Sequence, residues 1–301
     1  MTVQQASRQL LFQLYHIYDE REATNIADLV MEKVTEWKRI DRIVNKESTL
    51  SPDKEELLAF YISELSKHKP VQYVLNEAWF YGMKLYVDEH VLIPRPETEE
   101  LLDWIVEEAR ISDTGLQGGE AEERNRKIKG DGIRILDIGT GSGCIALGLK
   151  KKLPLAEIYA CDVSEAALAV AGKNALAQQV TIHLVRCDFL NREAIYDLPQ
   201  FTVIVSNPPY IPLKDKPAMY PNVLLYEPHL ALFVEDLDPM VFYASIANFA
   251  KNHLTGTGEI FVEIHEQMGA GVKNVFTQKG FKNITLRKDL QGKERMIMVR
   301  G

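Results

Sequence analysis

The sequence has few cysteines. Only Cys144, Cys161 and Cys187 occur among 301 residues, and none belongs to a Cys-x-x-Cys pair. A disulfide framework or a cysteine zinc site needs cysteines that are more numerous or closely spaced, so we expect neither. His265-Glu266 resembles the start of a zinc motif, but position 269 is Gly rather than His. We therefore expect no metal, and a reducing compartment.

The chain also lacks long apolar runs and an excess of positive charge. No segment approaches the roughly 20 apolar residues of a membrane span, and the start, MTVQQASRQLLFQLY, lacks the continuous apolar centre of a signal peptide. Lys and Arg number 35 against 43 Asp and Glu, a formal net charge of -8. Such a balance argues against affinity gained by neutralising nucleic-acid phosphates. We expect a cytoplasmic protein with no membrane partner and no direct nucleic acid requirement.

The length favours two domains, and the apolar pattern suggests where they lie. Over residues 1–70 the apolar residues recur at helical spacing, and Ser51 followed by Pro52 has the features of a helix start. Such a helical domain could be a structural cap or a docking surface. Residues 71–95 are rich in β-branched and aromatic residues, which predicts a β-hairpin linker. Residues 112–130 are polar and aperiodic, which predicts a flexible surface insertion.

The remainder, residues 96–301, alternates between strand and helix patterns and predicts an α/β fold. Buried parallel strands joined by helical crossovers are expected from this alternation. A last pair of strands joined through Gly292 should add an antiparallel edge. The apolar runs that we assign to the parallel strands are 133–138, 158–161, 181–185, 202–205 and 259–264.

A glycine-rich loop lies between the first of these strands and a helix. Gly139, Gly141 and Gly143 are spaced G-x-G-x-G, so the dinucleotide form G-x-G-x-x-G is not met. Glycines there let the backbone approach a ligand, and Asp162 at the next strand end can accept hydrogen bonds from ribose hydroxyls. Together they indicate an adenosine-type cofactor. Further on, Asp188 can bind an adenine amino group, while Phe189 can pack on the adenine ring or in the core.

The segment Asn207-Pro208-Pro209-Tyr210 follows another predicted strand. The prolines cannot continue a paired central strand, so this segment is a stiff turn. The Asn207 side-chain carbonyl and the Pro208 carbonyl are two fixed acceptors that can hold both hydrogens of an NH2 group. Tyr210 offers a flat face for a planar group. With no covalent nucleophile evident, positioning and charge stabilisation must carry catalysis, which suits the methyl sulfonium of S-adenosylmethionine.

These motifs resemble the class I S-adenosylmethionine-dependent methyltransferases and, more narrowly, the PrmC/HemK family of peptide chain release factor glutamine N5-methyltransferases. The narrower resemblance covers nearly everything from residue 70 onward. The departures are Asn76, where a Gly is expected, and the longer insertion at 112–130. The segments that carry the match are PVQYVLNEAWFYGMKLYVDEHVLIPRPETEELL from Pro70, LDIGTGSGCIAL from Leu136, YEPHLAL from Tyr226 and KDLQGKERMIMV from Lys288.

The resemblance implies a seven-stranded Rossmann-like methyltransferase domain, residues 96–301, with a helical substrate-docking domain, residues 1–70. It implies methylation of the glutamine of the release factor Gly-Gly-Gln motif, with S-adenosylmethionine as cofactor. We expect a monomer, although the sequence does not determine the oligomeric state. Matched to the family motifs, the catalytic residues are Asn207, Pro208 and Tyr210, and the substrate clamp adds Pro209. The cofactor-binding set is Gly139, Thr140, Gly141, Ser142, Gly143, Asp162, Asp188, Phe189 and Asn207.

Two other functions stay open at this point. The same turn could grip the exocyclic amine of adenine or guanine, which predicts a nucleic-acid methyltransferase, although the acidic charge opposes it. Alternatively, the chain could be a non-catalytic cofactor-binding protein. The sequence also leaves open whether some residues contact a ligand or only support the fold, namely Arg95, Glu97, Thr98, Glu227 and Glu263.

Overall fold

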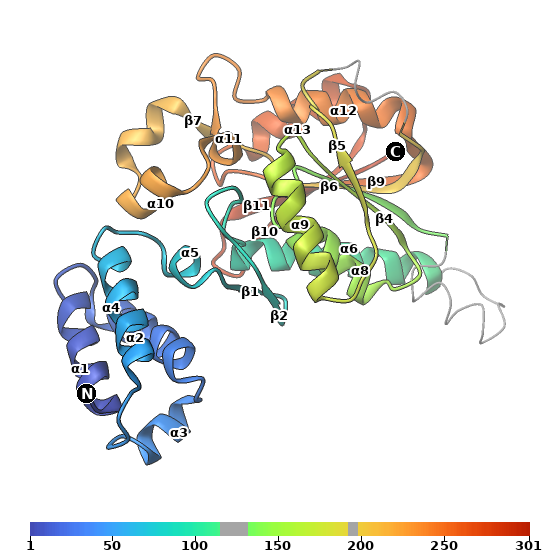
Figure 1. Ribbon diagram of the computed structural model, residues 1–301. Coiled ribbons are helices and arrows are strands. Elements are labelled where there is room, and N and C mark those ends of the chain that lie inside the picture. Colours follow the sequence, from blue (N-terminus) through green and yellow to red (C-terminus); the bar gives the residue numbers. More distant parts are fainter. Residues whose placement is uncertain (115–131, 192–197) are drawn as a thin grey trace. The chain divides into compact units, whose positions relative to one another are not determined.

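The computed structural model describes residues 1–114, 132–191 and 198–301 (Figure 1). Its residues form two compact units. The first combines Met1–Glu77 with Met219–Tyr226, and the second combines Ala78–Ala218 with Glu227–Gly301. Within the described ranges, no helix combines the length and apolar character needed to cross a membrane.

The first unit is helical, as the apolar spacing predicts. Its helix α1 begins with a capping box in which the side chains of Thr2 and Gln5 each accept from the other's backbone N–H. Ser51 precedes α4 as expected, but its side chain makes no capping hydrogen bond. The helices are α1 (Val3–Leu14), α2 (Glu20–Thr35), α3 (Arg39–Val44), α4 (Pro52–Leu65), α5 (Val71–Leu75) and α10 (Pro221–Tyr226).

The predicted hairpin is shorter than residues 71–95. Its first part is the helix α5, which ends at Asn76 in the left-handed conformation, with φ 51° and ψ 42°. Because Asn tolerates this helix-ending conformation, its replacement of the expected Gly is accommodated. The hairpin itself pairs β1 (Ala78–Phe80) with β2 (Met83–Leu85). Tyr81 and Gly82 both have positive φ, as the favoured two-residue turns require.

The second unit contains a seven-stranded sheet in the order β10-β11-β9-β6-β3-β4-β5. The five strands predicted to be parallel are so. The C-terminal strands are confirmed, but the antiparallel strand is β11, one position in from the edge, because it pairs with both β9 and β10. The strands are β3 (Arg134–Ile138), β4 (Glu157–Asp162), β5 (His183–Arg186), β6 (Phe201–Ser206), β9 (Leu254–Glu263), β10 (Asn283–Lys288) and β11 (Glu294–Arg300).

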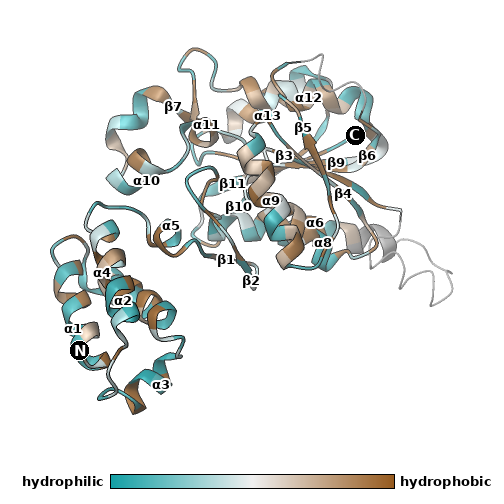
Figure 2. Ribbon diagram, viewed as in Figure 1, coloured by the Kyte–Doolittle hydropathy of each residue, from teal (hydrophilic) through white to brown (hydrophobic). Residues whose placement is uncertain are grey.

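Helices cover both faces of this sheet. α6 (Pro96–Thr114) and α8 (Cys144–Lys152) pack on one face, where Val203 and Val205 of β6 point. α12 (Val241–His253) and α13 (Gly269–Gln278) pack on the other, against Ile204. Burial on both sides explains the near-continuous apolar strands, visible as brown ribbon in Figure 2.

The remaining elements of the second unit lie beside the sheet. α9 (Glu165–Ala177) packs against β4 and β5. The short strands β7 (Ile211–Pro212) and β8 (Phe233–Val234) pair with each other, and the 3-10 helix η2 (Leu213–Ala218) and α11 (His229–Leu232) adjoin them. Because α6 continues through Thr114, the first three residues of the predicted insertion 112–130 are helical, and its other residues lie outside the described ranges.

Candidate functional site

The glycine loop connects β3 to α8. Gly139, Gly141 and Gly143 all have positive φ, at 71°, 54° and 81°, a region that L-residues with a Cβ rarely adopt. The loop is held against the neighbouring strand because the Cys161 carbonyl accepts hydrogen bonds from the N–H groups of Gly139 and Thr140, at 2.9 and 3.0 Å. Its conformation is therefore fixed by the backbone of β4 and depends on glycine at three positions.

The three glycines have different surroundings. A Cβ placed on Gly139 or Gly141 would meet no atom within 4 Å, whereas one on Gly143 would lie 3.2 Å from the Cβ of Ala171. Gly143 thus allows α8 and α9 to pack closely. The first two glycines instead border open space, where a ligand can approach the backbone.

Asp162 lies at the end of β4, beside this open space. Its Oδ2 accepts from the Gly141 N–H at 3.0 Å, and its Oδ1 accepts from the Ser164 N–H at 2.9 Å. A carboxylate has about four lone-pair sites, so two backbone donors fix its orientation and leave capacity for two more. This geometry is compatible with the predicted contact to a pair of hydroxyls.

Asp137 belongs to the same site, and the sequence analysis missed it. It is fully buried in β3, directly before the glycine loop. Its Oδ2 accepts from the Thr140 hydroxyl at 2.6 Å and the Ala146 N–H at 3.2 Å, but its Oδ1 has no partner. Burial raises the pKa of this carboxyl to about 7, despite the two hydrogen bonds that lower it. A buried carboxyl with an unsatisfied oxygen and a perturbed pKa marks a candidate functional site.

Asp188 and Phe189 follow β5. Asp188 is exposed, and its Oδ1 accepts from the Leu190 N–H at 2.9 Å. Phe189 is buried and packs edge-to-face on Phe249, with ring centroids 5.0 Å apart. These contacts favour the core-packing interpretation of Phe189 and give Asp188 a turn-forming contact.

The Asn-Pro-Pro-Tyr turn follows β6, which pairs with β3. Ser206 lies opposite Ile138 in that parallel register. The next residues, Asn207 and Gly139, therefore follow the ends of two neighbouring strands. Beyond the turn, Ile211 and Pro212 form β7 and pair with β8. The turn is therefore held on both sides by strand pairing, as expected for ligand sites at the carboxyl ends of parallel strands.

A chain of side-chain hydrogen bonds connects this turn to two distant segments. The Asn207 Nδ2 group donates to the Thr98 hydroxyl oxygen at 3.2 Å, and the Thr98 hydroxyl donates to Glu263 Oε2 at 2.7 Å. The Tyr210 hydroxyl donates to the other carboxylate oxygen, Oε1, at 3.3 Å. Two of the four turn residues are thus tied to one carboxylate, at the carboxyl end of β9.

Burial changes the titration of this cluster. It is the largest influence on Glu263 and raises the pKa of that carboxyl, although the hydrogen bonds from Thr98 and Tyr210 and the charge of Arg295 oppose it. Burial and the neighbouring Glu263 also raise the pKa of Tyr210. The tyrosine therefore stays protonated and acts as a hydrogen-bond donor.

Comparison with known proteins identifies the family. Residues 125–224 match the methyltransferase small domain, and residues 5–75 match the PrmC N-terminal domain. The release factor glutamine methyltransferase of Flavobacterium psychrophilum is 41% identical to this chain over 303 residues, covering 99% of both chains. That of Bacteroides thetaiotaomicron is 36% identical over 284 residues, covering 94% of this chain and 95% of the relative.

The chain belongs to the release factor glutamine methyltransferase family. The resemblance indicated by the sequence motifs is thereby confirmed. A solved structure, the catalytic domain of human Mettl16 in complex with an RNA hairpin, has 16% sequence identity and a TM-score of 0.53, covering 85% of this chain and 84% of that chain. This likeness shows that the two proteins share the fold.

In this member of the release factor glutamine methyltransferase family, Arg95 and Glu227 form an ion pair in which the carboxylate is buried and the guanidinium is partly exposed. Glu227 is buried, pairs with the Arg95 guanidinium, and accepts from the Ile93 N–H at 3.2 Å. Both contacts hold the segment before α6 against the segment before α11. They favour an anchoring role for Arg95 and Glu227, and Glu97 lies half-buried in the first turn of α6.

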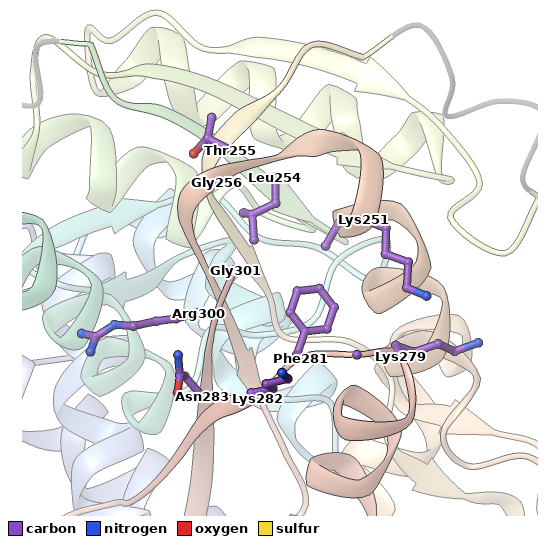
Figure 3. Close-up of a pocket in the computed structure, with 12 residues that line it drawn as sticks. Lys251, Leu254, Thr255, Gly256, Lys279, Phe281, Lys282, Asn283, Arg300 and Gly301 are labelled. Atoms are coloured by element: carbon purple, nitrogen blue, oxygen red, sulfur yellow. The ribbon is translucent and has the colours of Figure 1, made fainter.

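The protein also has a hollow of about 400 Å³, which lies far from the glycine loop and the Asn-Pro-Pro-Tyr turn. It lies beside Leu254, where β9 begins, whereas Glu263 lies where β9 ends. Figure 3 shows Lys251, Lys279 and Phe281 around it. None of the predicted site residues lines this hollow. No group of three or more His, Cys, Asp or Glu side chains suited to a metal occurs within the described ranges.

Proposed function

We propose that this protein transfers a methyl group from S-adenosylmethionine to the side-chain amide nitrogen of the glutamine in a release factor Gly-Gly-Gln motif. The observation that carries the proposal is the orientation of Asn207. Its NH2 group is bound to Thr98, which leaves its side-chain oxygen as an acceptor beside the open glycine loop. Relatives that match nearly the full chain are named release factor glutamine methyltransferases, which supports a glutamine of a release factor as the acceptor.

The residues around the glycine loop suit S-adenosylmethionine. Gly139 and Gly141 leave space against the backbone. Asp162 can accept from the two ribose hydroxyls. The free Oδ1 of Asp137 is buried next to the loop and complements an ammonium group, since a buried carboxylate is stabilised by an opposite charge. When bound, S-adenosylmethionine supplies a methyl carbon bonded to a positively charged sulfur.

The turn then has to hold the amide nitrogen. Asn207 Oδ1 and the Pro208 carbonyl accept its two hydrogens, and Tyr210 packs against the planar amide. Methyl transfer would join the nitrogen to the methyl carbon, leave the electron pair of the carbon–sulfur bond on sulfur, and release one proton from the nitrogen to water. As positive charge develops on nitrogen, the two carbonyl dipoles stabilise it.

A labelling experiment tests this function. The protein is incubated with S-adenosylmethionine labelled in its methyl group and with one of three acceptors: a release factor, the same factor with its Gly-Gly-Gln glutamine replaced by alanine, or DNA. We expect label on the unaltered factor alone. Label on DNA alone would favour the nucleic-acid methyltransferase, and an absence of label on all three would favour a cofactor-binding protein.

The docking of the release factor on residues 1–70 and the monomeric state are also part of this proposal. The first unit has exposed apolar side chains on α3, including Ile40 and Val44, that could contribute to a protein interface. A cytoplasmic location follows from the proposed substrate. Light scattering of the free protein, and of its complex with the factor, would measure both stoichiometries.

A further inference from the structure

The hydrogen bonds around Thr98 have a defined direction. A threonine hydroxyl has a single proton, and an ionised carboxylate can only accept. Since Thr98 Oγ1 lies 2.7 Å from Glu263 Oε2, its proton points to Glu263, and its oxygen must accept from Asn207 Nδ2, 3.2 Å away. Only the NH2 end of the asparagine amide can donate. While Glu263 is ionised, it therefore dictates the orientation of the Asn207 amide.

We propose that Thr98 and Glu263 are positioning residues that set the polarity of the Asn207 amide, so that its oxygen, and not its NH2 group, faces the substrate. The inference rests on the proposed function, because the acceptor that it orients is the one that holds the glutamine NH2. Neither residue needs to touch the substrate. Their effect reaches it through Asn207.

The opposite protonation state explains why the polarity matters. A protonated Glu263 can donate to Thr98, whose hydroxyl proton is then released to donate to Asn207. The asparagine side-chain amide can then rotate by half a turn, so that its NH2 group faces the substrate NH2 group. Two donors facing each other form no hydrogen bond, so the nitrogen loses one of its two acceptors.

Several charged or titratable groups act on Glu263 in addition to its two hydrogen-bond partners, Thr98 and Tyr210. Arg295 of β11 favours the ionised form, and Glu97 of α6 opposes it. The Tyr243 hydroxyl of α12 donates to the Glu263 backbone carbonyl at 3.0 Å. The Glu263 carboxylate also interacts electrostatically with Cys144 of α8. The ionised form thus has two side-chain donors and one cation to compensate for its burial.

The first test replaces Thr98. Thr98→Val keeps the side-chain shape and removes the hydroxyl, whereas Thr98→Ser keeps the hydroxyl. The matched control is Thr202→Val at the other end of β6, where the Thr202 hydroxyl bonds with the backbone N–H and carbonyl of Arg134, both at 2.9 Å. This control also loses a threonine hydroxyl from the second unit, but leaves the hydrogen bonds of Asn207 untouched.

We expect kcat of Thr98→Val to fall by about ten- to a hundredfold, the effect of about one to two lost hydrogen bonds. The dissociation constant of S-adenosylmethionine, measured by calorimetry, should change by less than about threefold, because the glycine loop is unaltered. Thr98→Ser should recover most of the lost kcat. Equal kcat values in Thr98→Val and the Thr202→Val control, or a Thr98→Ser variant no faster than Thr98→Val, would overturn the inference.

The second test needs no turnover. In protein with isotope-labelled asparagine, the NH2 resonance of Asn207, assigned with Asn207→Asp, is followed as the pH is lowered across the whole range in which the protein stays folded, because acid protonates a buried carboxylate. It should shift in the wild type and stay constant in Glu263→Gln. A wild-type Asn207 NH2 resonance whose chemical shift does not change with pH would contradict the inference. If the resonance shifts but the wild type labels no release factor, the proposed function fails and the positioning role stands.

Discussion

The affinity for S-adenosylmethionine should depend on pH through Asp137. The carboxyl has a pKa of about 7 without ligand because it is fully buried, and we assign its free Oδ1 to a positively charged group. Only the ionised form attracts that charge. A folded-state pKa above the usual range means that the attractive form is lost as the pH falls through about 7, so binding weakens on the acid side.

The size of this effect follows from one-proton linkage. If the protonated form does not bind, lowering the pH from about 8 to about 6 raises the dissociation constant about tenfold, equivalent to about 1.4 kcal/mol. Isothermal titration calorimetry at several pH values measures it. Repeating each titration in buffers of different ionisation enthalpy gives the number of protons released, which should approach one near pH 6 and fall toward zero near pH 8.

The control for this prediction is Asp137→Asn, which keeps the shape and removes the charge. It also separates the titration of Asp137 from that of the ligand's own amino group, whose pKa lies near the upper end of the pH range. We expect the variant to bind more weakly at pH 8 and to lose the acid-side dependence. The reasoning is refuted if the wild type and Asp137→Asn show the same change in affinity between pH 8 and pH 6.

Three further predictions concern the same site. Without ligand, the raised pKa of Asp137 costs stability progressively as the pH rises from the unfolded-state pKa of about 3.9 to about 7, so thermal unfolding should show Asp137→Asn gaining stability relative to the wild type between about pH 4 and about pH 7 and keeping a constant advantage above that. Asn207→Ala should lower kcat by at least about a hundredfold in the labelling assay and leave cofactor affinity within about tenfold; unchanged turnover would contradict its role. Gly139→Ala and Gly143→Ala should each lose about 1–2 kcal/mol of unfolding free energy from left-handed strain, and Gly143→Ala more, because its Cβ meets Ala171 at 3.2 Å. Only Gly139→Ala should also weaken cofactor binding at equal folded fraction, and equal losses in both variants would argue against a ligand at Gly139.

Sequence reasoning located the parts of the site that depend on local pattern. Gly139 and Asn207 could be brought together because each follows a buried parallel strand, and the carboxyl ends of such strands share one edge of the sheet. The sequence indicates Asp137 as a site residue less clearly. It is an acid in the apolar strand RILDI, directly before a glycine loop, and a carboxyl buried at such a place needs a reason.

Other features had no local signal. Thr98 and Asn207 are 109 residues apart and meet only because α6 packs beside the end of β6. The segment Val71–Leu75 has strand-like composition but forms a helix, since five residues are too few for periodicity to decide and tertiary contacts override propensity. Tertiary contacts also decide the place of Met219–Tyr226, because no pattern in this short segment shows that it packs with the first unit.

The two acceptors of the turn are fixed by different means, and this difference makes their roles separable. The Pro208 carbonyl is restrained by covalent rings on either side, which no change of pH can alter. The Asn207 oxygen is restrained by hydrogen bonds that lead through Thr98 to Glu263. Acid should therefore remove one acceptor and spare the other. A residual rate that persists below the pKa of Glu263, and that matches the rate of Thr98→Val at neutral pH, would measure what the proline carbonyl achieves alone.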